Sequence, residues 1–264
     1  MGNAAHRTIP VLLALVAAIT AVASGAPSPA LERTREAEPT ELVRRPLPTE
    51  LPEDPQDDAI RIVEGRHLVV RLERTMRVTS RPDGGRVIGV VPARSPYYGV
   101  QTRAWVLRLS PDGRFGLIPV PYAGRAVTGW LRLRGLRTTT TRISVLADLS
   151  GHRVSVRRGD RLIFSAPAAT GAASTPTPVG RYVVSDRVSF TAGSVYGTFA
   201  FGLSGIQTHL PAGWTGGNQL AIHGTNDPSS IGRSASYGCL RVSERVLDRL
   251  RPLLRLGTPV LVRP

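Results

Sequence analysis

The chain contains one cysteine, Cys239, which directly follows Gly238. A thiol attacks well only as a thiolate, so a catalytic cysteine needs a base or a positive field nearby. His223, sixteen residues earlier, is the nearest candidate base in the sequence. An unpaired cysteine can also be an inert buried residue, but the adjacent glycine favours a reactive one. The sequence therefore predicts nucleophilic catalysis, with Cys239 as the nucleophile and His223 as the base.

The residues around Cys239 suit attack on a carbonyl group. Gly238 allows the backbone to approach a substrate closely, and the amides of Gly238 and Cys239 can point together at one oxygen. A helix expected to begin after Ser243 would direct the positive end of its dipole toward the thiol if the two are close. We therefore expect an oxyanion hole beside a thiol of lowered pKa.

The residues that follow His223 are candidates for orienting its ring. The carbonyl of Gly224 can turn back toward the imidazole and fix its tautomer, a role that Asp or Asn fills in other triads. The side chains of Thr225 and Asn226 are alternative orienters. The residues alone do not decide which of these three groups orients the imidazole.

The elements expected to position the pair are mostly strands. Alternating apolar residues predict strands from residue 142 onward: 143–147, 153–157, 161–165, 181–185 and 258–262. The segment 158–160 is typical of a hairpin turn. The apolar spacing after Ser243 predicts a helix, which Pro252 ends or kinks. We expect a mainly β fold with one or two short helices.

A second group of short strands precedes this region and contains no catalytic constellation. The expected strands, separated by Pro-Asp-Gly turns, suggest a small β-barrel at 60–136: 67–71, 76–79, 86–91, 104–108 and 129–133. The segments 77–84 and 128–131 resemble bacterial SH3-like domains of wall-associated proteins. Residues 137–141 are interpreted as a linker.

The N-terminal residues predict export. Residues 1–25 combine an early arginine, an apolar run and small residues typical of a signal peptide or, alternatively, a membrane anchor. Residues 26–59 are rich in proline and in acidic residues and are interpreted as an extended linker. The protein is therefore expected on the extracytoplasmic side, in the cell wall or periplasm.

The charge of the chain limits its partners. The formal net charge is +15, and all 34 basic residues are arginine. An exported basic protein can meet anionic wall polymers. Nucleic acid is not expected, because aromatic residues make up only 5% of the chain and no recognisable binding module is present. No metal or cofactor is expected.

The segments 223–226 and 236–241, preceded by 174–182, resemble the L,D-transpeptidase family with the YkuD-type catalytic domain. The resemblance covers 141–264 and implies a β-sandwich catalytic domain. It implies a peptidoglycan transpeptidase whose cysteine attacks the third residue of a donor stem peptide, usually meso-diaminopimelate. D-Ala leaves, and an amine of a second stem resolves the thioester. Carbapenems acylate this cysteine in many members.

The resemblance also assigns roles to residues of the motif. It implies that Cys239 is the nucleophile, that His223 is the general base and acid, and that the Gly224 carbonyl orients the ring. The amides of Tyr237, Gly238 and Cys239 would be the oxyanion donors. The side chains expected to contact substrate are those of Arg241, Ser236, Thr225 and Asn226.

One departure from the family pattern and several alternatives stay open. The family usually has histidine where this chain has Tyr237. Water instead of an amine would make the enzyme an L,D-carboxypeptidase, and loss of activity would leave a wall-binding protein. Sortases also place His before Cys, but a different strand precedes their cysteine; papain-like amidases have the reverse order.

Overall fold

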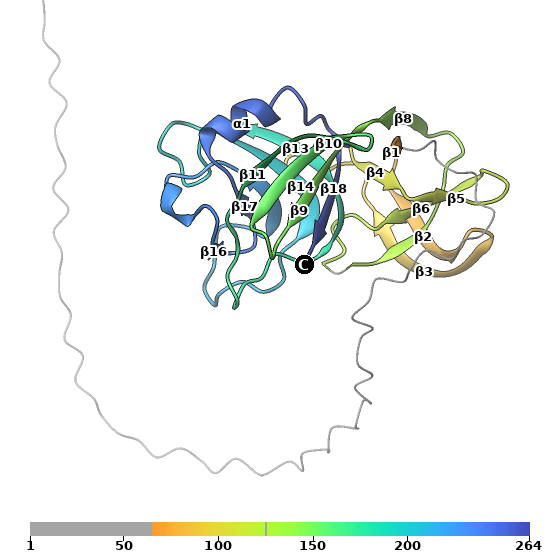
Figure 1. Cartoon of the computed structure of the whole chain (residues 1–264). Coiled ribbons are helices and arrows are strands. Elements are labelled where there is room, and N and C mark those ends of the chain that lie inside the picture. Colours follow the sequence, from red (N-terminus) through yellow and green to blue (C-terminus); the bar gives the residue numbers. More distant parts are fainter. Residues whose placement is uncertain (1–64, 125) are drawn as a thin grey trace, which may run out of the picture. The chain divides into compact units, whose positions relative to one another are not determined.

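Strands dominate the computed structural model, which describes residues 65–264 apart from residue 125 (Figure 1). The expected signal peptide or anchor and the expected linker at 26–59 lie outside the described residues. The helical elements in the described part are α1 (Glu244–Leu250) and the 3-10 turn η1 (Pro228–Ser230). No helix within the described ranges is long and apolar enough to cross a membrane. The expected mainly β fold is confirmed.

Residues 65–141, called the N-terminal β unit below, form two small sheets with the strand orders β3-β2-β7-β6-β5 and β4-β1-β8. Their bounds are β1 His67–Arg71, β2 Met76–Arg81, β3 Gly84–Val91, β4 Arg103–Val106, β5 Arg108–Leu109, β6 Phe115–Pro119, β7 Thr128–Arg132 and β8 Arg137–Thr141. The strands close around one apolar core that includes Val70, Leu72, Ile118 and Leu131. The resemblance of this unit to SH3-like domains stays a prediction.

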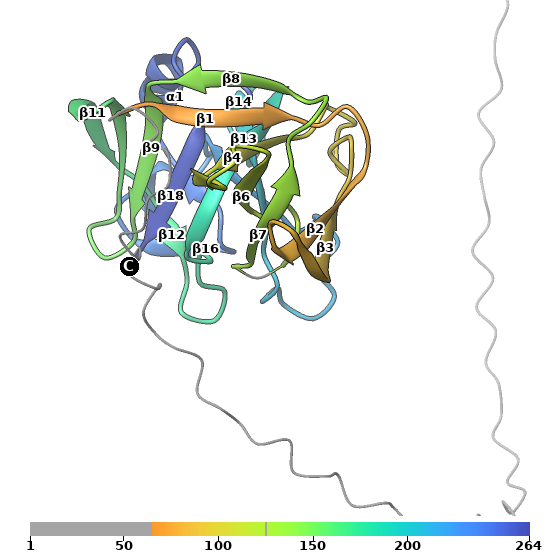
Figure 2. The same ribbon diagram turned by 90° about the vertical axis from the view of Figure 1, so that its right-hand side faces the viewer.

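The segment expected as a linker is a strand. Strand β8 pairs antiparallel with β1 along its whole length, from His67 opposite Thr141 to Arg71 opposite Arg137 (Figure 2). The run of threonines explains this, because β-branched residues favour extended backbone and β1 offers them a free edge. The linker interpretation of residues 137–141 is therefore wrong.

Residues 142–264, called the catalytic unit below because they contain the residues expected to do chemistry, form an eight-stranded mixed sheet in the order β11-β10-β9-β18-β13-β14-β15-β17. Their bounds are β9 Ile143–Asp148, β10 Arg153–Arg158, β11 Arg161–Pro167, β12 Thr170–Gly171, β13 Gly180–Ser189, β14 Phe199–Ile206, β15 Gln219–His223, β16 Ser234–Ser236, β17 Leu240–Arg241 and β18 Pro259–Arg263. The short strands β12 and β16 pair separately.

The long sheet encloses its own core. The pairing of β13 with β14 is irregular between Val184 and Asp186, and an irregularity of this kind bends a strand. Side chains from both halves then meet in one cluster, for example Val156 of β10 with Phe201 of β14. Helix α1 adds Leu247 to the same cluster. This arrangement has the two facing layers expected of a sandwich.

The sequence located the last helix well. Ser243 is the N-cap of α1, and its hydroxyl accepts a hydrogen bond from the Val246 amide (3.4 Å). The helix ends at Leu250, two residues before Pro252. Its placement immediately after β17 brings the start of α1 near the strands that carry Cys239 and His223.

Candidate active site

Two neighbouring strands position the residues expected to do chemistry: His223 is the last residue of β15, and Cys239 immediately precedes β17. Strands β15 and β17 run parallel, with Ile222 opposite Leu240 and His223 opposite Arg241. Ile222 and Leu240 are buried in the core. Because successive side chains of extended backbone point to opposite faces, His223 and Cys239 lie together on the other face.

His223 has one ring nitrogen fixed and one available. Its ring is buried, and Nδ1 lies 2.5 Å from the carbonyl oxygen of Gly224. A carbonyl only accepts hydrogen bonds, so Nδ1 carries the proton and Nε2 of the neutral ring has a free lone pair. Burial lowers the pKa of His223 to about 4, opposed by the bond to Gly224 and assisted by the charge of Arg241. At neutral pH the ring is therefore an uncharged base.

Gly224 must be glycine for this contact to form. A β-carbon at this position would collide with the carboxylate of Glu244 and lie 2.9 Å from the α-carbon of Gly197. Glu244, the first residue of α1, is itself held because it accepts a hydrogen bond from the Thr198 amide (3.1 Å). The packing of α1 against the end of β15 thus fixes the carbonyl that orients the imidazole.

Cys239 is partly exposed, with its sulfur against the backbone of β15. The Sγ–H group donates to the carbonyl oxygen of Gln219 at 3.8 Å, and in the described part of the chain it makes no hydrogen bond to His223. Burial raises the pKa of the Cys239 thiol, although the Ala221 amide and the charge of Arg241 act in the opposite direction. The net shift of this pKa is therefore upward, opposite to the expected lowering, since the cost of burying a thiolate outweighs the favourable contacts.

The turn before Cys239 depends on Gly238. Gly238 has a φ of +110°, a conformation that side chains rarely adopt, and a β-carbon there would collide with the amide of Gln207. The Gly238 amide donates to the Ser236 hydroxyl (3.0 Å), which donates to the Cys239 carbonyl (2.6 Å). Ser236 is buried, at 2% exposure. It therefore holds the turn together and does not meet substrate as expected.

Two amides of the turn remain available. The Gly238 amide donates to Ser236 in this structure, and its expected part in an oxyanion hole stays a prediction. The amides of Tyr237 and Cys239 have no hydrogen-bond partner among residues 65–264 other than 125. These two donors flank Gly238 beside the thiol, where the oxygen of an attacked carbonyl would need them.

Gln207 organises the site and was not predicted. It is buried, and its side-chain amide donates to the carbonyl oxygens of Pro176 (2.9 Å) and Tyr237 (3.1 Å). It thereby connects the loop before β13 to the turn that carries Gly238. Nothing in the local sequence around Gln207 signals this role, because its partners lie about thirty residues away on either side.

Aromatic side chains flank the site on two sides. The ring of Tyr196 stands edge-on to His223 with centroids 5.2 Å apart. Burial and then the charge of Cys239 raise the pKa of Tyr196, so its hydroxyl also lies near the thiol. Tyr237 is exposed and packs edge-on against Trp214 at 5.0 Å. Tyr196 and Trp214 were not predicted, since both lie on loops with no motif of their own.

The other residues expected to contact substrate differ in how far they are exposed. Thr225 is buried and accepts a hydrogen bond from the Asp227 amide (3.0 Å), so it forms the turn after β15 and does not orient His223. Asn226 is exposed. Arg241 is partly buried, and its Nε atom has no partner within the described ranges. Nor do those ranges contain a group of three His, Cys, Asp or Glu side chains that could hold a metal ion.

Comparisons with known proteins identify the family of this chain. The family model of the L,D-transpeptidase catalytic domain, YkuD, matches residues 142–262. The L,D-transpeptidase YkuD of Bacillus licheniformis is 31% identical over 166 residues, which cover 62% of this chain and 87% of that protein.

Parts of this chain are also similar to solved structures. Bd1075 of Bdellovibrio bacteriovorus is 27% identical with a TM-score of 0.36, over 47% of each chain. The L,D-transpeptidase LdtMt1 in complex with imipenem is 18% identical with a TM-score of 0.37, over 52% of this chain and 66% of that one. The chain thus spans about half of Bd1075 and two thirds of LdtMt1.

Proposed function

Because the chain belongs to the L,D-transpeptidase family with the YkuD catalytic domain, we propose that it is a cysteine acyltransferase that cross-links peptidoglycan. Cys239 would attack the third residue of a donor stem peptide and release the fourth residue, D-Ala. An amine of a second stem would then resolve the thioester and join the two third residues. The observation that carries the proposal is the buried neutral imidazole of His223, held by the Gly224 carbonyl on the strand beside Cys239.

The acylation step follows from the protonation states of the pair. The pKa of Cys239 is raised and that of His223 is lowered, so the resting pair is a thiol and a neutral imidazole. The thiol must rotate away from the Gln219 carbonyl, and its proton then passes to Nε2 as sulfur bonds to the carbonyl carbon. In structures without substrate, catalytic hydrogen bonds are often long or poorly aligned, and they tighten only when substrate binds.

The intermediate would be stabilised by the two free amides. As sulfur adds, the carbonyl oxygen becomes an oxyanion, which the amides of Tyr237 and Cys239 would bind. Collapse breaks the bond to D-Ala, and the imidazolium of His223 returns its proton to the leaving amine. The acceptor amine repeats the sequence on the thioester and loses its proton to Nε2. No metal or cofactor takes part in these steps.

Arg241 is the proposed contact for a substrate carboxylate. Its Nε atom is buried without a partner in the described residues, although a buried polar group normally has one. The guanidinium lies near both catalytic side chains, because its charge lowers the pKa of His223 and of Cys239. Stem peptides carry free carboxylates, and arginine binds these through charge-assisted hydrogen bonds.

The proposed setting is the cell wall. Proteins of this family act on peptidoglycan, and export by the N-terminal segment would bring the catalytic unit to it. Carbapenems are proposed as inhibitors that acylate Cys239. Binding of the arginine-rich surface to anionic wall polymers is a further proposal from the charge of +15.

The test is mass spectrometry of the soluble protein incubated with a disaccharide tetrapeptide stem, beside Cys239→Ala. A product of two stems less one D-Ala, absent with the variant, supports transpeptidation. A tripeptide stem alone would indicate an L,D-carboxypeptidase. If neither product forms and a carbapenem does not acylate the thiol, the chain is a wall-binding protein without this activity.

A further inference from the structure

A loop of the N-terminal β unit contacts strand β13 and the residue that precedes β15, the strand that ends at His223. This loop, residues 94–101, contains Ser95 and Tyr97. The Ser95 hydroxyl donates to Asp186 Oδ2 (3.1 Å), and the Tyr97 hydroxyl donates to Asn218 Oδ1 (2.8 Å). Asp186 and Asn218 both belong to the catalytic unit. The loop therefore makes two specific polar contacts across the interface between the units.

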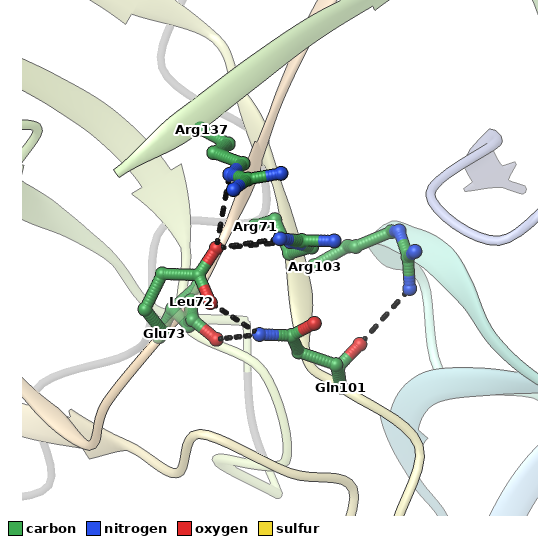
Figure 3. Close-up of polar contacts among 6 residues, drawn as sticks. All are labelled: Arg71, Leu72, Glu73, Gln101, Arg103 and Arg137. Carbon is green, nitrogen blue, oxygen red and sulfur yellow. Dashed lines mark hydrogen bonds and ion pairs between the residues drawn. The ribbon is translucent and has the colours of Figure 1, made fainter. Parts of the chain in front are cut away.

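The base of the loop is held in place by a polar network (Figure 3). The side-chain amide of Gln101 donates to the Leu72 carbonyl (3.1 Å) and to the Glu73 carboxylate (2.8 Å). Glu73 also accepts from Arg71 (2.8 Å), while Arg103 donates to the Gln101 carbonyl (3.0 Å). This network joins the end of the loop to the segment after β1, so the loop reaches the interface as a fixed element.

Asp186 connects the loop to the interior of the catalytic unit. It is completely buried, and its Oδ2 atom accepts from Ser95, from Ser185 (2.8 Å) and from the side-chain amide of Gln219 (2.6 Å). Its Oδ1 atom has no partner in the part of the chain that the structure describes. A buried carboxylate with so few donors is sensitive to the loss of any one of them.

The contacts of the loop lead to the start of β15, directly to Asn218 and through Asp186 to Gln219. Gln219 begins β15, and its carbonyl oxygen is the acceptor for the Cys239 thiol. Asn218, the partner of Tyr97, immediately precedes it. His223 lies at the other end of the same five-residue strand. The start of β15 is thus held by the N-terminal β unit, and its backbone holds the thiol.

We propose that Ser95 and Tyr97 are positioning residues for Cys239: the loop fixes Gln219 and Asn218, and these hold the start of β15, the strand whose backbone the Cys239 thiol lies against and whose last residue is His223. The N-terminal β unit then has a role in the chemistry besides any role in binding the wall. The inference rests on the proposed function only in taking Cys239 as the nucleophile. Displacements of about 1 Å in a reacting group can cost up to about a hundredfold in rate.

The test compares Ser95→Ala and Tyr97→Phe with matched controls in the same unit. Ser110→Ala removes a serine–aspartate bond from a buried serine, here to the exposed Asp112, that does not reach the catalytic unit. Tyr98→Phe removes the hydroxyl of the exposed neighbour of Tyr97. The readouts are iodoacetamide alkylation of Cys239 as a function of pH, amide exchange of residues 219–223, and kcat and KM for the tetrapeptide stem.

In both test variants we expect kcat to fall about tenfold with KM changed less than about twofold. The alkylation midpoint should move toward the ordinary thiol value, since a looser strand admits water and releases the thiol from the Gln219 carbonyl. Amide exchange at 219–223 should be faster. Ser95→Thr, which keeps the hydroxyl, should restore all three readouts.

The proposal is overturned if the test variants match their controls in alkylation midpoint, amide exchange and kcat. Alkylation and exchange need no peptide substrate, so they decide the matter even if the proposed transpeptidation fails. If Ser95→Ala does not fold, Tyr97→Phe decides alone, because its hydrogen bond is exposed and its loss does not threaten the core.

Discussion

The two β units differ in where they place polar groups. In the N-terminal β unit, the acidic residues Glu73 and Asp112 lie at the surface and pair with nearby arginines. The catalytic unit instead buries Asp186, Gln207 and His223. Buried polar groups are costly unless they are hydrogen-bonded, so a fold retains them where their position matters.

The difference indicates how each unit uses its framework. The surface pairs of the N-terminal β unit contribute little to stability individually. Its buried hydroxyls include those of Ser95 and Thr102, and Ser95 faces the other unit. In the catalytic unit His223 is itself buried, and the buried Gln207 holds the turn before Cys239. Variants of these groups should therefore affect activity most, and variants of the N-terminal β unit outside the loop 94–101 should affect it less.

The largest effect is expected for Cys239→Ala. Removing the thiol removes the proposed nucleophile, so turnover of the tetrapeptide stem should be abolished. The thermal midpoint should stay within a few degrees of wild type, as is usual for a small change at a partly exposed site. Mass spectrometry of the products and a thermal melt check both parts. Full activity in this variant would contradict the entire mechanism.

His223→Ala should lower kcat by about two orders of magnitude or more, because the general base and acid is lost. The matched control is His67→Ala in the N-terminal β unit, where the ring packs edge-on against Trp105 at 5.3 Å and has no catalytic neighbour. Steady-state kinetics on both variants test the comparison directly. Equal losses would mean that the imidazole acts through folding alone.

His223 also predicts a pH dependence of stability. Its pKa is about 4 in the folded protein, chiefly through burial, against an ordinary value of 6.5. Between these values the unfolded chain binds a proton that the folded chain does not, so the free energy of unfolding falls as pH falls from 6.5 to 4. The shift corresponds to about 3 kcal/mol.

Urea unfolding at pH 7 and pH 4.5 measures this effect. His223→Gln should lose less stability than wild type over that interval. His67 should contribute to the pH dependence in the same direction, because partial burial lowers its pKa as well. His67→Gln should therefore leave most of the pH dependence in place. A wild-type slope that persists in His223→Gln would refute the assignment.

Gly238→Ala should reduce kcat about tenfold or more, since the new β-carbon meets Gln207 and displaces the turn that carries the free amides. Backbone strain at positive φ should add about 1 to 3 kcal/mol of destabilisation. Gly113→Ala is the control, because Gly113 also has positive φ (+68°) but no atom within 4 Å of the added carbon. Backbone strain should lower the stability of both variants in urea unfolding. Displacement of the turn should lower kcat only in Gly238→Ala.

The sequence predicted those parts of the molecule that depend on local pattern. Strand alternation placed β1 and β9, and an N-cap placed α1, because these signals act between neighbours in the chain. The pair His223 and Gly224 was also predictable, since the two are adjacent.

Contacts across the fold were beyond the reach of the sequence. Gln207 and Tyr196 have no motif, and they join the site only through sheet topology. The roles of Ser236 and the Gly238 amide depend on one hydrogen bond inside a turn, which a motif does not reveal. Strand β8 was missed because a run of threonines outside an apolar pattern is typical of a linker.

Tyr237→His should have the smallest effect and tests the departure from the family pattern. The Tyr237 side chain is exposed and packs on Trp214, whereas its backbone supplies a carbonyl to Gln207 and an amide to the proposed oxyanion hole. Because substitution leaves that backbone in place, kcat should stay within about tenfold of wild type. A larger change, measured with the tetrapeptide stem and checked against Trp214→Phe, would show that the side chain at this position takes part in proton transfer or acceptor binding.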